Sequence, residues 1–282
     1  MVIAISGATG FIGKRFQLAY PAPKHTFVVL GRLWAVETPK ALDGCDAVIH
    51  LAGEPVAQRW NDDVKERIRS SRTDGTRQVV EAVARCRQKP RVMVCASAVG
   101  FYGSRGSETL TEASDPGTGY LPEVCRAWET AADGVLTLGL RLVKLRIGMV
   151  LGRGGGALAT METPFKLGVG GRLGSGQQWM SWIHLEDMVR LIQFALENEN
   201  ISGVMNAVAP NPVTNEEFTE TYARALHRPA VIPVPEFAIR MLFGEMASII
   251  MASQRVLPSM AQDAGFQFRF GELESALKEI YD

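Results

Sequence analysis

The 282-residue sequence predicts an α/β fold with a doubly wound parallel sheet, followed by a small, mainly helical cap. Three observations predict it. Short apolar runs alternate with helical patterns through the first half of the chain, the signature of a parallel sheet with crossover helices. The length suits one large domain with an appendage, and 46% hydrophobic against 21% charged residues is typical of a folded protein. The second half is rich first in glycine and then in helical patterns.

Six apolar runs are expected to form the strands of this sheet. Several are apolar at consecutive positions, which is typical of strands that are buried on both faces. Only about fifteen residues separate the second run from the third, so this part of the winding is abbreviated. The runs are VIAIS from Val2, FVVL from Phe27, DAVIHLA from Asp46, VMVCAS from Val92, VKLRIGMVLG from Val143 and GVMNAVA from Gly203.

Helical spacing of apolar residues predicts the helices. Thr214 and Glu217 form a capping box, in which the threonine accepts from the backbone at a helix start and the glutamate reaches back. The other expected helices cover residues 74–87, 122–132 and 157–167 and a stretch that begins at Leu185.

No internal repeat and no low-complexity linker separates the two halves, which argues against two domains on a tether. The Met- and Phe-rich stripe from Phe237 to Met251 is interpreted as cap core or as the interface of a homodimer. The sheet domain is expected over residues 1–160 and 181–209, and the cap over residues 161–180 and 210–282.

Charge and cysteine content narrow the class of partner and the location. Lys plus Arg equals Asp plus Glu at 30 each, so no net field attracts the chain to nucleic acid or to a membrane surface. The four cysteines have no C-x-x-C spacing and are expected to be buried thiols in a reducing compartment. No run approaches the ~18 apolar residues of a membrane span. With Met1 leading directly into VIAI and no signal peptide visible, we expect a cytoplasmic protein.

A glycine-rich segment, SGATGFIG, follows the first apolar run and opens a helical pattern. Its glycines, Gly7, Gly10 and Gly13, permit a tight turn, the approach of a pyrophosphate to the backbone, and close packing of the helix on the strand. The free amides at the helix start then bind phosphates. After a strand at the N-terminus, this motif predicts a dinucleotide-binding site and hence a Rossmann-like sheet.

The end of the second run predicts which dinucleotide binds. NAD-binding proteins place Asp or Glu there to accept a hydrogen bond from the ribose 2′-hydroxyl. This run ends in Leu30, Gly31 and Arg32, and a guanidinium cannot accept that bond but can bind a 2′-phosphate. We therefore predict NADP(H) rather than NAD(H). The alternative is that Arg32 is a solvated surface arginine.

Motifs along the whole chain resemble a known family. SGATGFIG, HLAGEPV, SAVGFYG and WIHLED, in this order, resemble the extended short-chain dehydrogenase/reductases, whose typical member is a nucleotide-sugar epimerase. The chain resembles the atypical "epimerase family" subgroup more closely. The resemblance implies a Rossmann-like fold, a small C-terminal cap over the substrate cleft, and bound NADP(H). The closer motifs are SRTDGT from Ser71, EVCRAWE from Glu123, the block from Leu151 to Asp187, and AVAPNPVTNEEF from Ala207.

The resemblance also implies cofactor contacts, position by position. Ser97 and Met149 would lie near the nicotinamide end. Arg72 would touch the dinucleotide too, and it stands near an expected helix start; the alternative is a solvated helix charge. The other implied contacts are Gly7, Thr9, Gly10, Phe11, Ile12, Gly13, Gly31, Arg32, Leu51, Ala52 and Gly53.

The Tyr-x-x-x-Lys pair of the reductases is missing from the expected place. Only Tyr20 and Lys24 have that spacing, and the two prolines between them prevent a helix. Ser97 and Tyr102 hold the family's catalytic serine position and a turn tyrosine, so they are the catalytic candidates. Ser97 would hydrogen-bond a substrate carbonyl. Tyr102 would donate a proton, inefficiently without a neighbouring cation, or only pack.

Two charged residues and a group of amides and indoles are further candidates. Glu123 and Arg126 lie on the helix where the missing pair belongs, as replacements or as a solvated face. Gln178, Trp179 and Trp182, with Gln177 beside them, suit a polar, ring-shaped substrate, or they are core aromatics with surface amides. His184 is interpreted as structural, and no metal site is predicted.

The sequence therefore predicts an NADP(H)-binding oxidoreductase or epimerase-like enzyme that acts on a small-molecule substrate. The alternative is a non-catalytic protein that binds NADP(H) as a redox sensor or to control a partner. The missing lysine keeps that alternative open.

Overall fold

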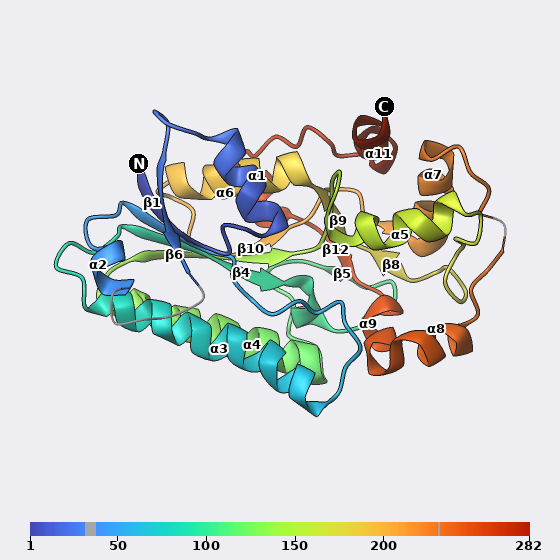
Figure 1. Cartoon of the computed structure of the whole chain (residues 1–282), viewed down its shortest axis with the longest axis horizontal. Coiled ribbons are helices and arrows are strands. Elements are labelled where there is room, and N and C mark those ends of the chain that lie inside the picture. The colour runs from blue at the N-terminus through green and yellow to red at the C-terminus, as the bar shows by residue number, and fades with distance from the viewer. Residues whose placement is uncertain (32–37, 231) are drawn as a thin grey trace.

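Six parallel strands form the central sheet of the computed structural model, which describes residues 1–31, 38–230 and 232–282 (Figure 1). Their order is β10-β6-β4-β3-β1-β2, and every adjacent pair is parallel. Each strand overlaps one of the six apolar runs, although β2, β4 and β6 extend one or two residues beyond theirs. The strands are β1 (Val2–Ser6), β2 (Thr26–Leu30), β3 (Ala47–His50), β4 (Val92–Ala98), β6 (Arg141–Ile147) and β10 (Gly203–Ala207).

The direction of winding reverses at β1, because β2 lies on one side of it and β3 on the other. In open α/β sheets, ligands bind outside the carboxyl ends of the strands at such a reversal. Ser6, the last residue of β1, lies opposite both Leu30 and His50, so three carboxyl ends meet there. The topology thus points to the loop after β1 as the centre of a binding site.

Helices cover both faces of the sheet. They are α1 (Phe11–Ala19), α2 (Thr38–Leu42), α3 (Asp62–Ala84), α4 (Tyr120–Asp133), α6 (Leu185–Glu197) and α10 (Ser259–Asp263). Ile3 and Ile5 of β1 belong to a core shared with α1 and α6, whereas Ala4 belongs to the core under α3 and α4. Figure 1 shows these two helical layers above and below the strands. The doubly wound α/β class is therefore confirmed.

Helix α3 is longer than the sequence predicts. The prediction covered residues 74–87, where apolar residues recur on one face, but the helix begins twelve residues earlier at Asp62. Asn61 caps that start, since its Oδ1 accepts a hydrogen bond from the Val64 amide at 2.8 Å. The first half of the helix is rich in charged residues, which conceal its periodicity.

The run from Val143 forms two strands rather than one. β6 ends at Ile147, and β7 (Met149–Leu151) leaves the central sheet to pair with β9 (Trp182–His184). Gly148 separates them in a tight place, because a Cβ at this position would lie 2.6 Å from the Ser181 carbonyl oxygen. Such crowding is invisible in the sequence.

The segments beyond the sheet are mainly helical, as predicted, and gather beyond one end of the strands (Figure 1). Phe218 and Tyr222 of α7 pack with Leu277 of α11 in a separate core. Among the helices of the described ranges, none is both long and apolar enough to cross a membrane. The elements are α5 (Gly156–Lys166), α7 (Asn215–Ala225), α8 (Glu236–Phe243), α9 (Ala247–Ile250), α11 (Leu273–Tyr281), and the short strands β5 (Thr109–Leu110), β8 (Trp179–Met180), β11 (Val213–Thr214) and β12 (Arg255–Val256).

Candidate functional site

The loop between β1 and α1 has the shape of a phosphate cradle. Gly7 has φ +73°, and a Cβ at this residue would lie 2.8 Å from the carbonyl carbon of Leu51. At Gly13 an added Cβ would lie 2.3 Å from the Gly7 oxygen. Gly10 precedes the helix without a side chain to cap it, which leaves the first amides of α1 for a ligand. The three glycines therefore fit the pyrophosphate of a dinucleotide.

The Phe11 ring packs the β1–α1 loop against a second glycine-rich segment, GRGGG, at residues 152–156. A Cβ at Gly155 would come within 2.3 Å of this ring, and one at Gly152 or Gly156 within 3.0 Å. The glycines of this segment therefore leave the room that the aromatic ring occupies. Ile12 is half-buried beside Phe11, and Thr9 is exposed.

Two more predicted cofactor segments follow β2 and β3. Leu51 and Ala52 lie directly against Gly7, and the exposed Gly53 follows them. Gly31 is exposed just after β2. Arg32 lies outside the described residues, so its proposed contact with a 2′-phosphate rests on the sequence.

A buried histidine ties the cradle to α3. His50 Nδ1 lies 2.6 Å from Ser6 Oγ, and His50 Nε2 lies 3.0 Å from Thr76 Oγ1. Burial lowers the pKa of His50 to about 4, so the ring is neutral at pH 7. The histidine thereby links the end of β1 to a helix on the sheet's face.

Arg72 lies in the middle of α3 rather than at a helix start. Its Nη1 donates to the Glu54 carbonyl at 3.0 Å and to the Ile68 carbonyl at 3.1 Å, and its guanidinium lies 5.1 Å from the Trp128 ring centroid. Burial lowers the pKa of Arg72. The side chain is also next to Gly53, so the structure brings Arg72 to the loop that faces Gly7.

Three polar residues line up across the other half of the sheet. Ser97 of β4 lies opposite Arg146 of β6, and Arg146 lies opposite Asn206 of β10. Directly paired residues of a parallel sheet point to the same face. The three side chains therefore form one polar row near the carboxyl ends of adjacent strands.

Glu129 of α4 completes this row as a buried ion pair. Its Oε1 accepts from Arg146 Nε at 2.8 Å and its Oε2 from Arg146 Nη2 at 3.0 Å. The Ser97 hydroxyl donates to the same Oε1 at 2.7 Å. Glu129 and Arg146 side chains are only 8% and 5% exposed, so the pair is screened from water.

Tyr102 joins the cluster from the short helical turn 99–102. Its hydroxyl donates to Asn206 Oδ1 at 2.7 Å and accepts from Arg146 Nη1 at 3.0 Å. The side chain is 0% exposed. Burial raises the pKa of Tyr102, while the adjacent Arg146 acts in the opposite direction. The structure thus brings Ser97 and Tyr102 into one network but encloses the tyrosine completely.

The charged residues of this network, Glu129 and Arg146, differ from the pair that the sequence suggested. Glu123 and Arg126 are exposed, and Glu123 lies 3.7 Å from Arg69, outside the cluster. Glu129 and Arg146 were missed. The available signal was an arginine between two apolar residues, Leu145 and Ile147, near the end of an expected strand, since a buried guanidinium requires a partner.

The substrate candidates lie in different environments. Trp182 is 0% exposed in the core shared with α7 and α11, and its Nε1 donates to the Asn211 carbonyl at 3.0 Å. Trp179 is partly exposed, with the Arg255 guanidinium 4.5 Å from its ring centroid. Gln178 is buried, and among the described residues its Oε1 has no hydrogen-bond partner. An orphaned acceptor could receive a ligand donor.

Met149 and His184 lie at the start of β7 and the end of β9. Met149 is partly exposed and is held through its amide by the Ser181 carbonyl. His184 caps α6, because its Nδ1 accepts from the Glu186 amide at 3.2 Å while its Nε2 lies 2.9 Å from Glu279. His184 is therefore structural. Within residues 1–31, 38–230 and 232–282, no cluster of His, Cys, Asp or Glu is arranged to hold a metal ion.

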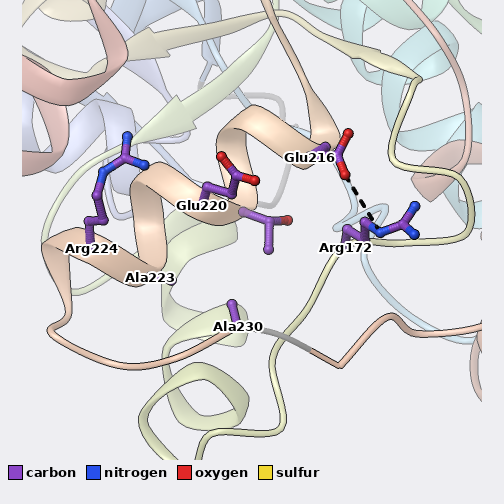
Figure 2. Close-up of a pocket in the computed structure, with 7 residues that line it drawn as sticks. Arg172, Glu216, Glu220, Ala223, Arg224 and Ala230 are labelled. Atoms are coloured by element: carbon purple, nitrogen blue, oxygen red, sulfur yellow. Dashed lines mark ion pairs between the residues drawn. The ribbon is translucent and has the colours of Figure 1, made fainter.

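Two surface hollows lie near these segments. One of about 450 Å³ lies along α7, where Arg172 Nε lies 3.7 Å from Glu216 Oε1 and Glu220 lies further along the helix (Figure 2). The other, of about 350 Å³, is bordered by Glu54 and Ser71 and so adjoins the loop after β3. The second hollow, not the first, adjoins the predicted cofactor segments.

The sequence matches known protein families over most of its length. Residues 3–207 match the NAD dependent epimerase/dehydratase family, and residues 234–280 match a domain of unknown function, DUF1731. The Arabidopsis thaliana epimerase family protein SDR39U1 homolog, chloroplastic, is 39% identical in an alignment of 301 positions that covers 99% of this chain and 86% of the plant protein. The Bacillus subtilis epimerase family protein YfhF is 38% identical in an alignment of 297 positions that covers 99% of this chain and 98% of that protein.

A solved structure resembles the fold from end to end. The crystal structure of human epimerase family protein SDR39U1 (isoform 2) with NADPH is similar with a TM-score of 0.93 and 34% identity, over 100% of this chain and 99% of the human one.

Proposed function

Because this chain belongs to the NAD dependent epimerase/dehydratase family, in its epimerase family protein branch, we propose that it is an NADP(H)-dependent oxidoreductase or epimerase-like enzyme with a small-molecule substrate. The nicotinamide would give a hydride to, or take one from, a carbon of the substrate. The chain itself would bind the dinucleotide, orient the substrate oxygen and exclude water.

The observation that carries this proposal is the cradle at Gly7. A methyl group has no room at Gly7 or Gly13, and the amides at the start of α1 are left uncapped. Such an arrangement serves the close approach of a diphosphate to the backbone. The loop also lies where the winding of the sheet reverses, the usual position of a dinucleotide.

The choice of NADP(H) over NAD(H) has two supports. The human relative was crystallised with NADPH. In the sequence, Arg32 follows two residues after Leu30, and a guanidinium there favours a 2′-phosphate. These two supports are independent, so the assignment of NADP(H) as the cofactor does not require that Arg32 contacts its 2′-phosphate.

Ser97 is the proposed contact to the substrate oxygen. It lies near the carboxyl end of β4, next to the strand that leads to Leu51 and the cradle, and it is held by the ion pair beneath it. The cap residues Gln178 and Trp179 would face the substrate, since one has an orphaned acceptor and the other a partly exposed ring.

A non-catalytic role as an NADP(H)-binding sensor or partner-binding protein is the second candidate. One observation favours it: Tyr102 is fully enclosed and so is not placed to give a proton to a ligand. A homodimer and a cytoplasmic location are further proposals. All four cysteines are buried thiols, which suits a reducing compartment, and the plant relative is named chloroplastic.

The test uses ligand-stripped protein. Calorimetry should detect NADPH binding more tightly than NADH, and Arg32→Ala should weaken NADPH far more than NADH. Turnover is then followed at the nicotinamide absorbance with matched carbonyl and carbinol panels, for the wild type and Ser97→Ala. If NADPH binds but no carbonyl or carbinol compound is turned over, the non-catalytic role is favoured. If neither NADPH nor NADH gives a heat of binding, both the enzymatic and the non-catalytic role are rejected.

A further inference from the structure

The hydrogen bonds around Ser97 have a fixed direction. Arg146 has only N–H groups to offer, so it donates to Glu129 and to the Tyr102 oxygen. Paired through both oxygens with this guanidinium, Glu129 is a carboxylate that can only accept hydrogen bonds. Ser97 has a single hydroxyl hydrogen, and it is therefore the donor in the 2.7 Å contact with Glu129.

The hydrogen of Tyr102 is committed in the same way. Arg146 can only donate to the phenolic oxygen, and Asn206 Nδ2 donates to the Leu257 carbonyl at 2.9 Å. Asn206 Oδ1 is thus the acceptor for the tyrosine hydroxyl. Neither Ser97 nor Tyr102 keeps a hydrogen for an incoming group.

No residue in the described part of the chain donates to the Ser97 oxygen, so its lone pairs stay available to a ligand. A substrate carbonyl brought to it would set lone pairs against lone pairs, whereas a hydroxyl would donate to it. The sequence suggests the reverse role, in which Ser97 donates to a carbonyl.

We propose that Glu129 is a positioning residue that makes Ser97 a hydrogen-bond acceptor, so that the site selects the carbinol form of its substrate over the carbonyl form. This inference rests on the proposed function only in taking Ser97 to face the substrate oxygen. Arg146 acts through Glu129 by holding the carboxylate in place. The selected ligand class is a secondary alcohol, whose hydroxyl donates to Ser97 Oγ.

The first test observes the serine hydroxyl itself. In protein with ¹³C-labelled serine, the Ser97 hydroxyl proton should exchange slowly with solvent and should shift when Glu129→Met is introduced. Rapid exchange that is indifferent to this substitution overturns the proposal. Turnover is not needed for this measurement, so it stands apart from the test of the proposed function.

The second test measures ligand preference with probes that do not react with NADP⁺. 1-Methylcyclohexanol has a hydroxyl but no carbinol hydrogen, and cyclohexanone is already oxidised. In saturation-transfer NMR on the NADP⁺-saturated wild type, the alcohol should bind about 3- to 10-fold more tightly, the range of one neutral hydrogen bond. Equal binding of the two probes, or binding of neither, overturns the preference.

A double variant reverses the direction of bonding. Glu129→Met with Arg146→Met replaces the buried ion pair by apolar chains of similar size, a change that proteins often tolerate. The freed Ser97 hydroxyl can then donate, and the preference should move toward cyclohexanone. Ser97→Ala is the control that should bind both probes alike. A double variant that folds and still prefers the alcohol contradicts the role of Glu129. If the double variant does not fold, the wild type and Ser97→Ala decide the outcome.

Discussion

Arg146 Nη1 lies 3.0 Å from the phenolic oxygen of Tyr102, so the tyrosine has a cation beside it although no lysine follows it at the reductase spacing. The cation does not make the tyrosine a ready acid. Burial raises the pKa of Tyr102 against the influence of Arg146, and the hydroxyl is enclosed. The pair is better understood as part of the sheet's polar core.

Tyr102→Phe should therefore weaken folding more than ligand binding. The substitution leaves Asn206 Oδ1 and one Arg146 N–H without their partner, which should lower the free energy of unfolding by about 1–3 kcal/mol. Urea unfolding measures this loss, and calorimetry should find unchanged NADPH affinity. Tyr222→Phe, which removes another buried hydroxyl far from the row, is the matched control. A selective loss of turnover in Tyr102→Phe, with stability intact, would restore the tyrosine as an acid.

Gly7→Ala should abolish tight dinucleotide binding. The added methyl group would lie 2.8 Å from Leu51 backbone at φ +73°, so the loop must move out of the cradle. Strain of about 1–3 kcal/mol corresponds to about a 5- to 150-fold loss of NADPH affinity by calorimetry. Gly139→Ala is the control, because Gly139 also has positive φ (+83°) but open space around it. NADPH affinity that is lost equally in both variants would point to global destabilisation instead.

His50 should make the fold sensitive to mild acid. Its folded pKa is about 4 against an ordinary 6.5, so the unfolded chain binds more protons between these values. The stability that neutral His50 contributes is present above pH 6.5 and is lost as pH falls to 4, by about 3 kcal/mol in all.

Urea unfolding at pH 7 and pH 4.5 measures the His50 effect. His50→Gln should flatten the pH dependence relative to the wild type. His227→Asn should not, because His227 is exposed and asparagine accepts its φ of 53°. Identical pH profiles for the wild type and His50→Gln would assign the acid sensitivity to other groups.

Trp182 and Trp179 should differ in how much each contributes to stability. Trp182→Ala removes a fully buried ring and should cost about 3–5 kcal/mol of unfolding free energy. Trp179→Ala should cost less, since the ring is partly exposed and mainly loses its contact with Arg255, about 0.5–2 kcal/mol. Urea unfolding of both variants decides this order. A Trp182 variant as stable as the wild type would contradict the core placement.

Much of the fold was available from local patterns. The strands β1 and β4 are continuous apolar runs, and the capping box at Thr214 was correct in that Thr214 Oγ1 accepts from the Glu217 amide at 3.2 Å. The start of α3 was missed because charged residues hide its period. The break at Gly148 was missed because its cause is a carbonyl of a distant strand.

The sequence by itself determined the parallel α/β sheet, the glycine cradle after its first strand, and the absence of the Tyr-x-x-x-Lys pair, since each is a pattern of neighbouring residues. Only the tertiary structure decided that Ser97, Arg146 and Asn206 share one row and that Glu129 closes it. The physical reason is register: which residues of separate strands lie opposite one another is set by packing of the whole sheet. That packing also decides where the hydrogen of Ser97 points.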